Sequence, residues 1–115
     1  MAAEPSVNHK LMVSREGLEV MAEAVKALTL REERFQRLSD VITTALETVE
    51  PESAALPEGF GEDPPLGGPI PINLRLTKRL NKELDMFRAS LCERGISHCG
   101  VRETVIYCAM QIATE

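Results

Sequence analysis

Five side chains in two short segments of this 115-residue chain are suited to binding a ligand, because they alternate with apolar residues. They are Asn8, Lys10, Met12, Asn73 and Arg75. Arg and Lys can donate hydrogen bonds to guanine O6 and N7, Asn can bond to adenine N6 and N7, and a two-stranded ribbon fits the major groove. These residue types suit the reading of base edges in duplex DNA. Any solvated strand face also carries polar residues, so a face that binds nothing is the alternative at this point.

Other groups of reactive residues do not form a recognisable site. Cys92, His98, Cys99 and Cys108 are ligands that zinc accepts, but their spacing does not fit a zinc knuckle, and Cys108 belongs to an apolar helical stripe. The two histidines have no matched nucleophile or carboxylate in sequence. We therefore expect no metal, no cofactor and no enzyme activity. Three cysteines in one half of the chain make a poor disulfide framework, so we also expect reduced thiols.

The total charge argues against a generic nucleic-acid binder. Lys and Arg number 13 against 18 Asp and Glu, which gives a formal charge of -5. The charge is unevenly distributed: residues 1–50 carry 6 basic and 9 acidic side chains, residues 51–71 carry 0 and 4, and residues 72–115 carry 7 and 5. The last segment alone is basic, so a local cationic face is compatible with an acidic chain.

The elements that would position the five side chains occur twice. Residues 51–71 contain six Pro and four Gly, which predicts a linker between two halves. At an offset of 63 residues the halves agree in residue class over about 40 positions, which indicates an internal repeat. Residues 8–13 and 72–76 alternate as short strands, and Ser14 and Thr77 follow them as candidate N-caps of helices.

Two helices are expected after each strand. The first pair of stripes has apolar residues at spacings of three and four, namely Leu18, Met21, Val25 and Leu28 in one half and Leu80, Leu84, Phe87 and Leu91 in the other. The second pair consists of Phe35, Leu38, Ile42, Ala45 and Val49, and of Val101, Val105, Cys108 and Ile112. Each half therefore reads as strand, helix, helix.

A strand-helix-helix unit of this size cannot bury a core alone, and its single strand would have two unpaired edges. The two strands are therefore expected to pair while four helices cover their apolar face. The predicted fold is mainly α with a short two-stranded antiparallel ribbon. Residues 7–50 and 72–115 form the two units, residues 51–71 link them, and the whole is one compact domain, a monomeric pseudo-dimer.

Specific runs resemble the ribbon-helix-helix superfamily of the Arc and MetJ repressors. They are Ile72-Asn73-Leu74-Arg75-Leu76, a helix ending at Gly95, and Arg102-Glu103-Thr104-Val105-Ile106-Tyr107. The first half resembles the same pattern more weakly, from Lys10 to Ser14 and from Leu38 to Ile42. Two units in one polypeptide are similar to the tandem members of the superfamily, such as the TraY-type relaxosome proteins and the VirC-operon accessory protein of T-DNA transfer.

The resemblance implies that the outward strand residues enter the major groove and that the amides at the start of the second helix of each unit hold a phosphate. The first role would fall on the five residues named above. The second would fall on Leu38, Ser39, Gly100, Val101 and Arg102, and the cations Arg37 and Lys78 are expected to contact phosphate as well. Free N–H groups and the helix dipole attract anions in any case. Met12 and Pro71 depart from the polar pattern, so the ribbon is expected to bind an asymmetric site.

The resulting expectation is a cytoplasmic double-stranded-DNA-binding protein that acts as a repressor or as an accessory factor in plasmid or T-DNA transfer or partition. It would be a monomer that can assemble side by side on DNA. No run of the sequence approaches the roughly 18 apolar residues that a membrane span needs. The alternative is an acidic protein-interaction module, such as an antitoxin, a DNA mimic or an assembly factor, that uses its acidic helix faces.

Overall fold

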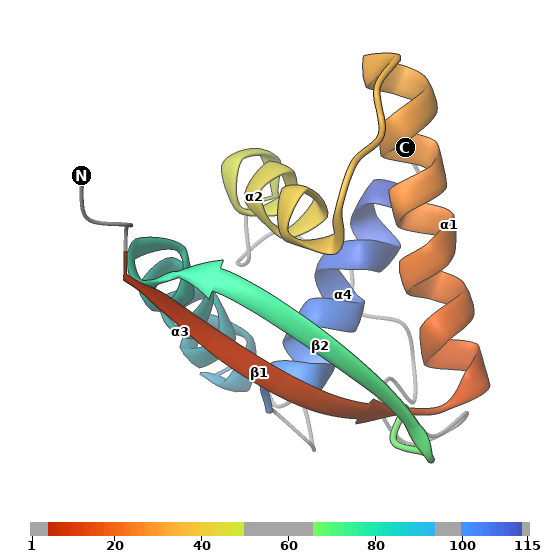
Figure 1. Cartoon of the computed structure of the whole chain (residues 1–115). Coiled ribbons are helices and arrows are strands. Elements are labelled where there is room, and N and C mark those ends of the chain that lie inside the picture. Colours follow the sequence, from red (N-terminus) through yellow and green to blue (C-terminus); the bar gives the residue numbers. More distant parts are fainter. Residues whose placement is uncertain (1–4, 50–65, 94–99, 114–115) are drawn as a thin grey trace.

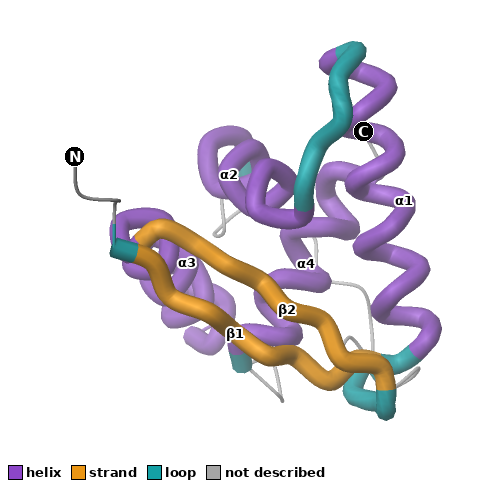
Figure 2. Tube along the Cα trace, in the orientation of Figure 1, coloured by secondary structure: helices purple, strands orange, loops and turns teal. Residues whose placement is uncertain are grey.

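A computed structural model describes residues 5–49, 66–93 and 100–113 of the chain. The elements follow one another as β1 (Ser6–Val13), α1 (Arg15–Glu32), α2 (Leu38–Thr48), β2 (Ile70–Thr77), α3 (Lys78–Glu93) and α4 (Val101–Ala113). Within these residues the two strands form one antiparallel pair, and the four helices lie behind it (Figures 1 and 2). The predicted class, mainly helical with a short two-stranded antiparallel ribbon, is confirmed.

Both strands are longer than the alternation of the sequence predicted. β1 begins at Ser6 and β2 at Ile70, so the last two residues of the predicted linker, Ile70 and Pro71, belong to the ribbon. Pro71 is compatible with a strand here because each strand of a two-stranded ribbon has a free edge, where a missing N–H is tolerated. Residues 51–65 of the predicted linker lie outside the described residues.

The ribbon buries one face and exposes the other. Leu11, Val13, Leu74 and Leu76 are buried beneath it. Because side chains alternate along a strand, a shift of one residue in the pairing would expose this whole set. Burial of these four side chains therefore fixes which residues point outward.

The two helices that follow the strands begin where the hydroxyl residues predicted them. Ser14 Oγ accepts a hydrogen bond from the Gly17 N–H at 3.1 Å, and Thr77 Oγ1 accepts one from the Leu80 N–H at 3.1 Å. Each bond satisfies an N–H of the first turn that has no partner within the helix. Both predicted caps are confirmed.

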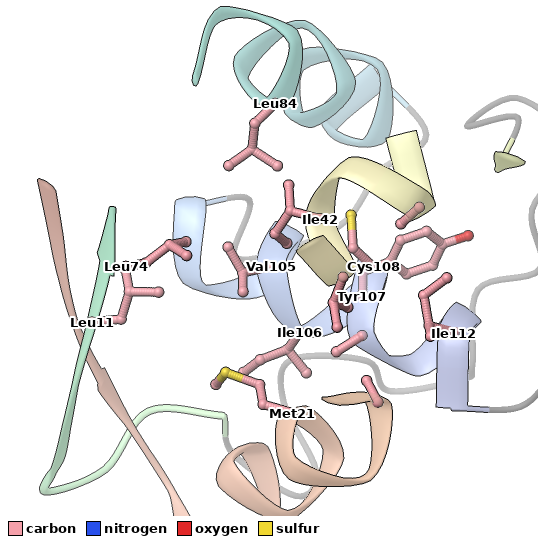
Figure 3. Close-up of a cluster of buried hydrophobic side chains, with 14 of the residues drawn as sticks. Leu11, Met21, Ile42, Leu74, Leu84, Val105, Ile106, Tyr107, Cys108 and Ile112 are labelled. Atoms are coloured by element: carbon pink, nitrogen blue, oxygen red, sulfur yellow. The ribbon is translucent and has the colours of Figure 1, made fainter. Parts of the chain in front are cut away.

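Helix α4 lies at the centre of the core. Figure 3 shows it between the ribbon side chains Leu11 and Leu74, Met21 of α1 and Leu84 of α3. Seven consecutive residues, from Glu103 to Ala109, are buried, so the helix is covered on every side there, in contrast to the single stripe that the sequence predicted. Buried members outside that stripe include Ile106, Tyr107 and Ala109. A helix that is covered all round has no polar face, so its period gives little guide to its neighbours.

Helix α1 approaches α4 closely because it presents small residues. A Cβ added to Gly17 would lie 3.0 Å from Cδ1 of Ile106, and Ala24 is fully buried. The backbone of α1 therefore comes within the reach of α4 side chains.

One predicted core residue is in the wrong place. Phe35 precedes α2, which begins at Leu38, and 97% of its surface is exposed. The hydroxyl of Thr29 accepts a hydrogen bond from the Gln36 N–H at 3.0 Å and holds this segment in a non-helical path. Spacing alone placed Phe35 in the helical stripe, but the helix starts one turn later.

Candidate functional site

The outer face of the ribbon brings together the five residues that the sequence selected. Asn8, Lys10, Met12, Asn73 and Arg75 are all exposed on it. The antiparallel register pairs Asn8 with Arg75, Lys10 with Asn73, and Met12 with Pro71. The five side chains therefore form one continuous surface, although the two strands are separated in sequence by more than 50 residues.

This outer face is cationic in an acidic chain. None of the 16 residues of β1 and β2 is Asp or Glu. Within the described part of the chain, Lys10 and Arg75 form no ion pair. Arg75 Nε instead donates a hydrogen bond to Ser6 Oγ at 2.9 Å. This bond keeps the guanidinium over the face and leaves its charge unneutralised.

The predicted phosphate contacts at the start of α2 lie beside a carboxylate. The N–H of Arg37, the N-cap residue of α2, donates to Asp40 Oδ2 at 2.8 Å, so the amide that precedes the first turn is occupied. Among the described residues, the N–H groups of Leu38 and Ser39 have no hydrogen-bond acceptor, as expected at a helix start. The same dipole that attracts phosphate attracts the Asp40 carboxylate, so the two compete at this position.

The start of α4 repeats this arrangement and adds a second feature. The Gly100 N–H donates to Glu103 Oε1 at 3.2 Å. Arg102 Nε forms an ion pair with Glu103 Oε2 at 2.5 Å, and Arg102 Nη1 donates to the carbonyl oxygen of Met12 at 3.2 Å. A Cβ on Gly67 would lie 2.8 Å from Arg102 Nη1, so this glycine leaves room for the guanidinium. Arg102 therefore ties α4 to the end of β1.

The remaining predicted phosphate contacts are Lys78 and Val101. Lys78 is exposed at the first residue of α3, and its N–H donates to the carbonyl of Pro5 at 2.9 Å. Val101 is half-buried at the first residue of α4. In the described part of the chain, Lys78 and Arg37 form no ion pair, whereas Arg102 does.

An apolar groove beside the ribbon was missed from the sequence. It has a volume of about 600 Å³ and lies between α1, the segment before α2, and β2. Its lining includes Leu18, Val25, Leu30, Phe35 and Ile72. The signal that would have found it is Phe35, an aromatic residue in a segment with too few neighbouring apolar residues to cover it.

His9 lies on the inner side of the ribbon, on the same face as Leu11 and Val13. Its Nε2 donates to Asn81 Oδ1 of α3 at 2.6 Å, and the pair is half-buried. A half-buried polar pair needs such a mutual hydrogen bond, which binds the ribbon to α3.

The cysteines differ from expectation in one respect. Cys92 is disulfide-bonded, so the prediction of reduced thiols is wrong for this residue. An odd number of cysteines excludes complete pairing but not a single bridge. Cys108 is free and buried, and burial raises the pKa of its thiol to about 12. Cys99 and His98 lie outside the described residues, and within residues 5–49, 66–93 and 100–113 no three His, Cys, Asp or Glu residues gather at a metal-binding distance.

Comparisons with known proteins do not assign the chain to a family. No protein-family model, curated protein or solved structure matches it. Among the described helices, none has the length and apolar character to cross a membrane.

Proposed function

We propose that this protein is a tandem ribbon-helix-helix protein that binds double-stranded DNA by inserting its ribbon in the major groove. The observation that carries the proposal is the outer face of the ribbon. It combines Lys10 and Arg75, which have no acidic partner among the described residues, with two exposed Asn side chains and no carboxylate. These donors and acceptors match the base edges of the major groove. The biological role would be repression, or an accessory function in plasmid or T-DNA transfer or partition, without enzyme activity.

The relation between the two halves supports the tandem part of the proposal. Helices α1 and α3 begin at Arg15 and Lys78, and α2 and α4 begin at Leu38 and Val101, so both pairs of starts differ by the 63-residue offset. The caps Ser14 and Thr77 are related by the same offset, as are the carboxylates of Asp40 and Glu103 at the starts of α2 and α4.

The pairing of the strands supports the same proposal. Lys10 pairs with Asn73, and these two residues are themselves equivalent at the offset of 63. When two antiparallel strands pair at equivalent residues, a twofold axis that passes between these residues relates one strand to the other. The ribbon then belongs equally to both halves, and neither half completes the core without the other.

Affinity for DNA is expected to depend strongly on salt. Each phosphate that a cation neutralises contributes about -0.9 to the slope of log affinity against log salt concentration. Lys10, Arg37, Arg75 and Lys78 are the exposed cations near the ribbon and the helix starts that have no ion pair in the described part of the chain. The acidic remainder of the chain opposes binding at long range, so affinity should be modest and should fall quickly as salt rises.

The test is a fluorescence-anisotropy titration of duplex DNA from the region upstream of the protein's own coding sequence, at several salt concentrations with random duplex as competitor. Arg75→Ala should weaken binding by about 1–3 kcal/mol and relax one base preference. Arg34→Ala is the matched control, because Arg34 is also exposed and lies in the segment after α1. Both variants lose one positive charge, so only position separates them. Equal effects of the two variants, or no salt-dependent binding, would refute the proposal.

The second candidate is a protein-interaction module, and the exposed Phe35 beside the apolar groove favours it. A monomeric protein rarely leaves an aromatic ring fully in water beside an apolar surface. This candidate predicts a stoichiometric complex with a protein partner that Phe35→Ala weakens, and no salt-dependent affinity for DNA. The same titration therefore separates the two functions.

A further inference from the structure

Resting on the proposed function, we infer that the ribbon reads a DNA element that is not palindromic, with a polar half recognised by Asn8 and Arg75 and an apolar half recognised by Met12 and Pro71. The ligand class is duplex DNA that has guanine or adenine at one end of the element and thymine methyl groups at the other. The inference follows from the order of side chains along the outer face.

The outer face changes chemistry from one end to the other. Asn8 and Arg75 are cross-strand partners near one end, and Met12 and Pro71 are partners at the other. All four are exposed, and Met12 has 41% of its surface in solvent. Side-chain donors on the outer face are therefore concentrated at one end of the ribbon, while the outward side chains at the other end, Met12 and Pro71, consist only of carbon, hydrogen and sulfur. The nearby Arg102 guanidinium is already engaged by Glu103 and by the carbonyl oxygen of Met12.

Pro71 adds no backbone donor at the apolar end, and one backbone acceptor there is already used. Pro71 has no N–H, and the carbonyl oxygen of Met12 already accepts from Arg102. A polar base edge placed there would lose its hydrogen bond to water and would gain no hydrogen bond to a Met12 or Pro71 side chain. The C5 methyl group of thymine is the feature of the major groove that an apolar side chain contacts favourably.

The polar end is organised for hydrogen bonding. Arg75 uses its Nε to donate to Ser6 Oγ at 2.9 Å, which leaves the two terminal nitrogens of the guanidinium for guanine O6 and N7. Asn8 stands opposite Arg75 and has the donor and acceptor that adenine N6 and N7 require.

The difference between the two ends comes from the residues at equivalent positions and not from the backbone. At the 63-residue offset, Met12 is equivalent to Arg75 and Asn8 is equivalent to Pro71. The same two positions therefore carry an Asn and an Arg at one end and a Pro and a Met at the other. A protein with the identical backbone and identical halves would read the same bases twice.

The distance between the two ends of the outer face determines how many base pairs the recognised DNA sequence spans. Successive outward residues on a strand are about 6.7 Å apart, and base pairs are stacked about 3.4 Å apart. One cross-strand pair thus corresponds to about two base pairs, and the Asn8–Arg75 and Met12–Pro71 pairs to positions about four base pairs apart. The pair of Lys10 and Asn73 lies between them.

The experiment makes the two ends chemically alike. Met12→Arg and Pro71→Asn are combined in the full chain, and duplexes with a randomised core are selected by the wild type and by this double variant. The wild type should select a motif with guanine at one end only. The double variant should select a palindromic motif with guanine at both ends, and should prefer that duplex to the wild-type motif by about tenfold or more. Met12→Leu is the control, because it keeps the apolar end and should keep the wild-type motif.

The outcomes separate this inference from the proposed function. If the wild type binds no duplex at low salt, random DNA included, both are overturned, and if it binds every duplex equally, the inference alone is overturned. If the wild type selects a palindrome, or if the double variant keeps the wild-type motif, the protein binds DNA but the ends are not read as inferred. Far-UV circular dichroism checks that the double variant is folded. If it is not, Met12→Arg alone is used, and it must add a guanine preference at the second end.

Discussion

Arg102→Ala should destabilise the fold, because Arg102 connects two elements that are distant in sequence. Its guanidinium pairs with Glu103, donates to the carbonyl oxygen of Met12 and lies against Gly67. The Glu103 side chain is 7% exposed, whereas that of Arg102 is 36% exposed. The variant leaves a buried carboxylate with one fewer partner and removes the hydrogen bond between α4 and β1.

The expected loss lies between two limits. Breaking a fully buried ion pair costs about 3–5 kcal/mol, and breaking a surface pair costs about 0–1 kcal/mol. Water reaches Arg102, and Glu103 keeps the Gly100 N–H, so the upper limit does not apply. We expect a loss of about 2 kcal/mol in the free energy of unfolding, against a total of about 6–17 kcal/mol for a chain of this length.

Urea unfolding followed by far-UV circular dichroism measures this loss. With a slope of about 2 kcal/mol per molar urea, the midpoint should fall by about 1 M. Arg79→Ala is the matched control, because the Arg79–Glu83 pair at 3.6 Å is largely exposed and should contribute less than about 0.5 kcal/mol. In a Glu103→Gln background the effect of Arg102→Ala should shrink. Equal midpoints for Arg102→Ala and Arg79→Ala would show that Arg102 does not stabilise the contact between α4 and β1. Its predicted phosphate contact has a separate readout, a fall of about one in the salt slope for DNA.

Two further predictions concern the two Phe rings of different burial and the buried thiol of Cys108. Phe35→Ala should change the free energy of unfolding by less than about 0.5 kcal/mol, because the ring is exposed. Phe87→Ala should cost about 3–5 kcal/mol, because it removes a ring that is 6% exposed and lies 6.1 Å from the ring of Tyr107. Similar urea midpoints for the two variants would contradict the different burial of the two rings. Between about pH 9 and pH 12 the unfolded chain releases the thiol proton of Cys108, whereas the folded chain retains it because its pKa is raised. The free energy of unfolding should therefore be unaffected by this thiol below about pH 9 and should fall by about 1.4 kcal/mol per pH unit as pH rises towards 12. Urea titrations between about pH 8 and pH 10 should therefore show a steeper loss for the wild type than for Cys108→Ala, and parallel curves would contradict this coupling.

The ribbon and the first helix of each half were predictable because local rules determine them. Alternation of apolar residues identified the buried faces around Leu11 and Leu74, and a hydroxyl residue marked each helix start. These signals need no knowledge of distant residues, since strand period and capping act within a few positions. The five outward residues followed directly from the same alternation.

Features that depend on contacts between distant segments were not predictable. The role of Arg102 requires the end of β1 to lie beside the start of α4, which no local pattern encodes. The burial of Tyr107 requires a helix covered on all sides, where the apolar period that identifies a stripe disappears. Phe35 fitted a stripe by spacing, but the position of the helix start decided against it.

Under the proposed repeat, differences between the two halves account for the unequal packing of the helices. At the offset of 63 residues, Gly17 and Ala24 of α1 correspond to Leu80 and Phe87 of α3. The small residues let α1 approach α4. The corresponding residues of α3 are large, and a groove of about 390 Å³ that includes Met86 lies between α2 and α3.

A single chain makes such differences possible. In a symmetric dimer of identical chains each substitution appears twice, so close packing on one side imposes close packing on the other. Under the proposed repeat, one half of this chain supplies the close contact with α4 while the other retains an open groove. The same freedom applies to the outer face of the ribbon, where Arg75 and Met12 occupy equivalent positions. An asymmetric core and an asymmetric DNA element would then share one cause, the independent variation of two covalently joined halves.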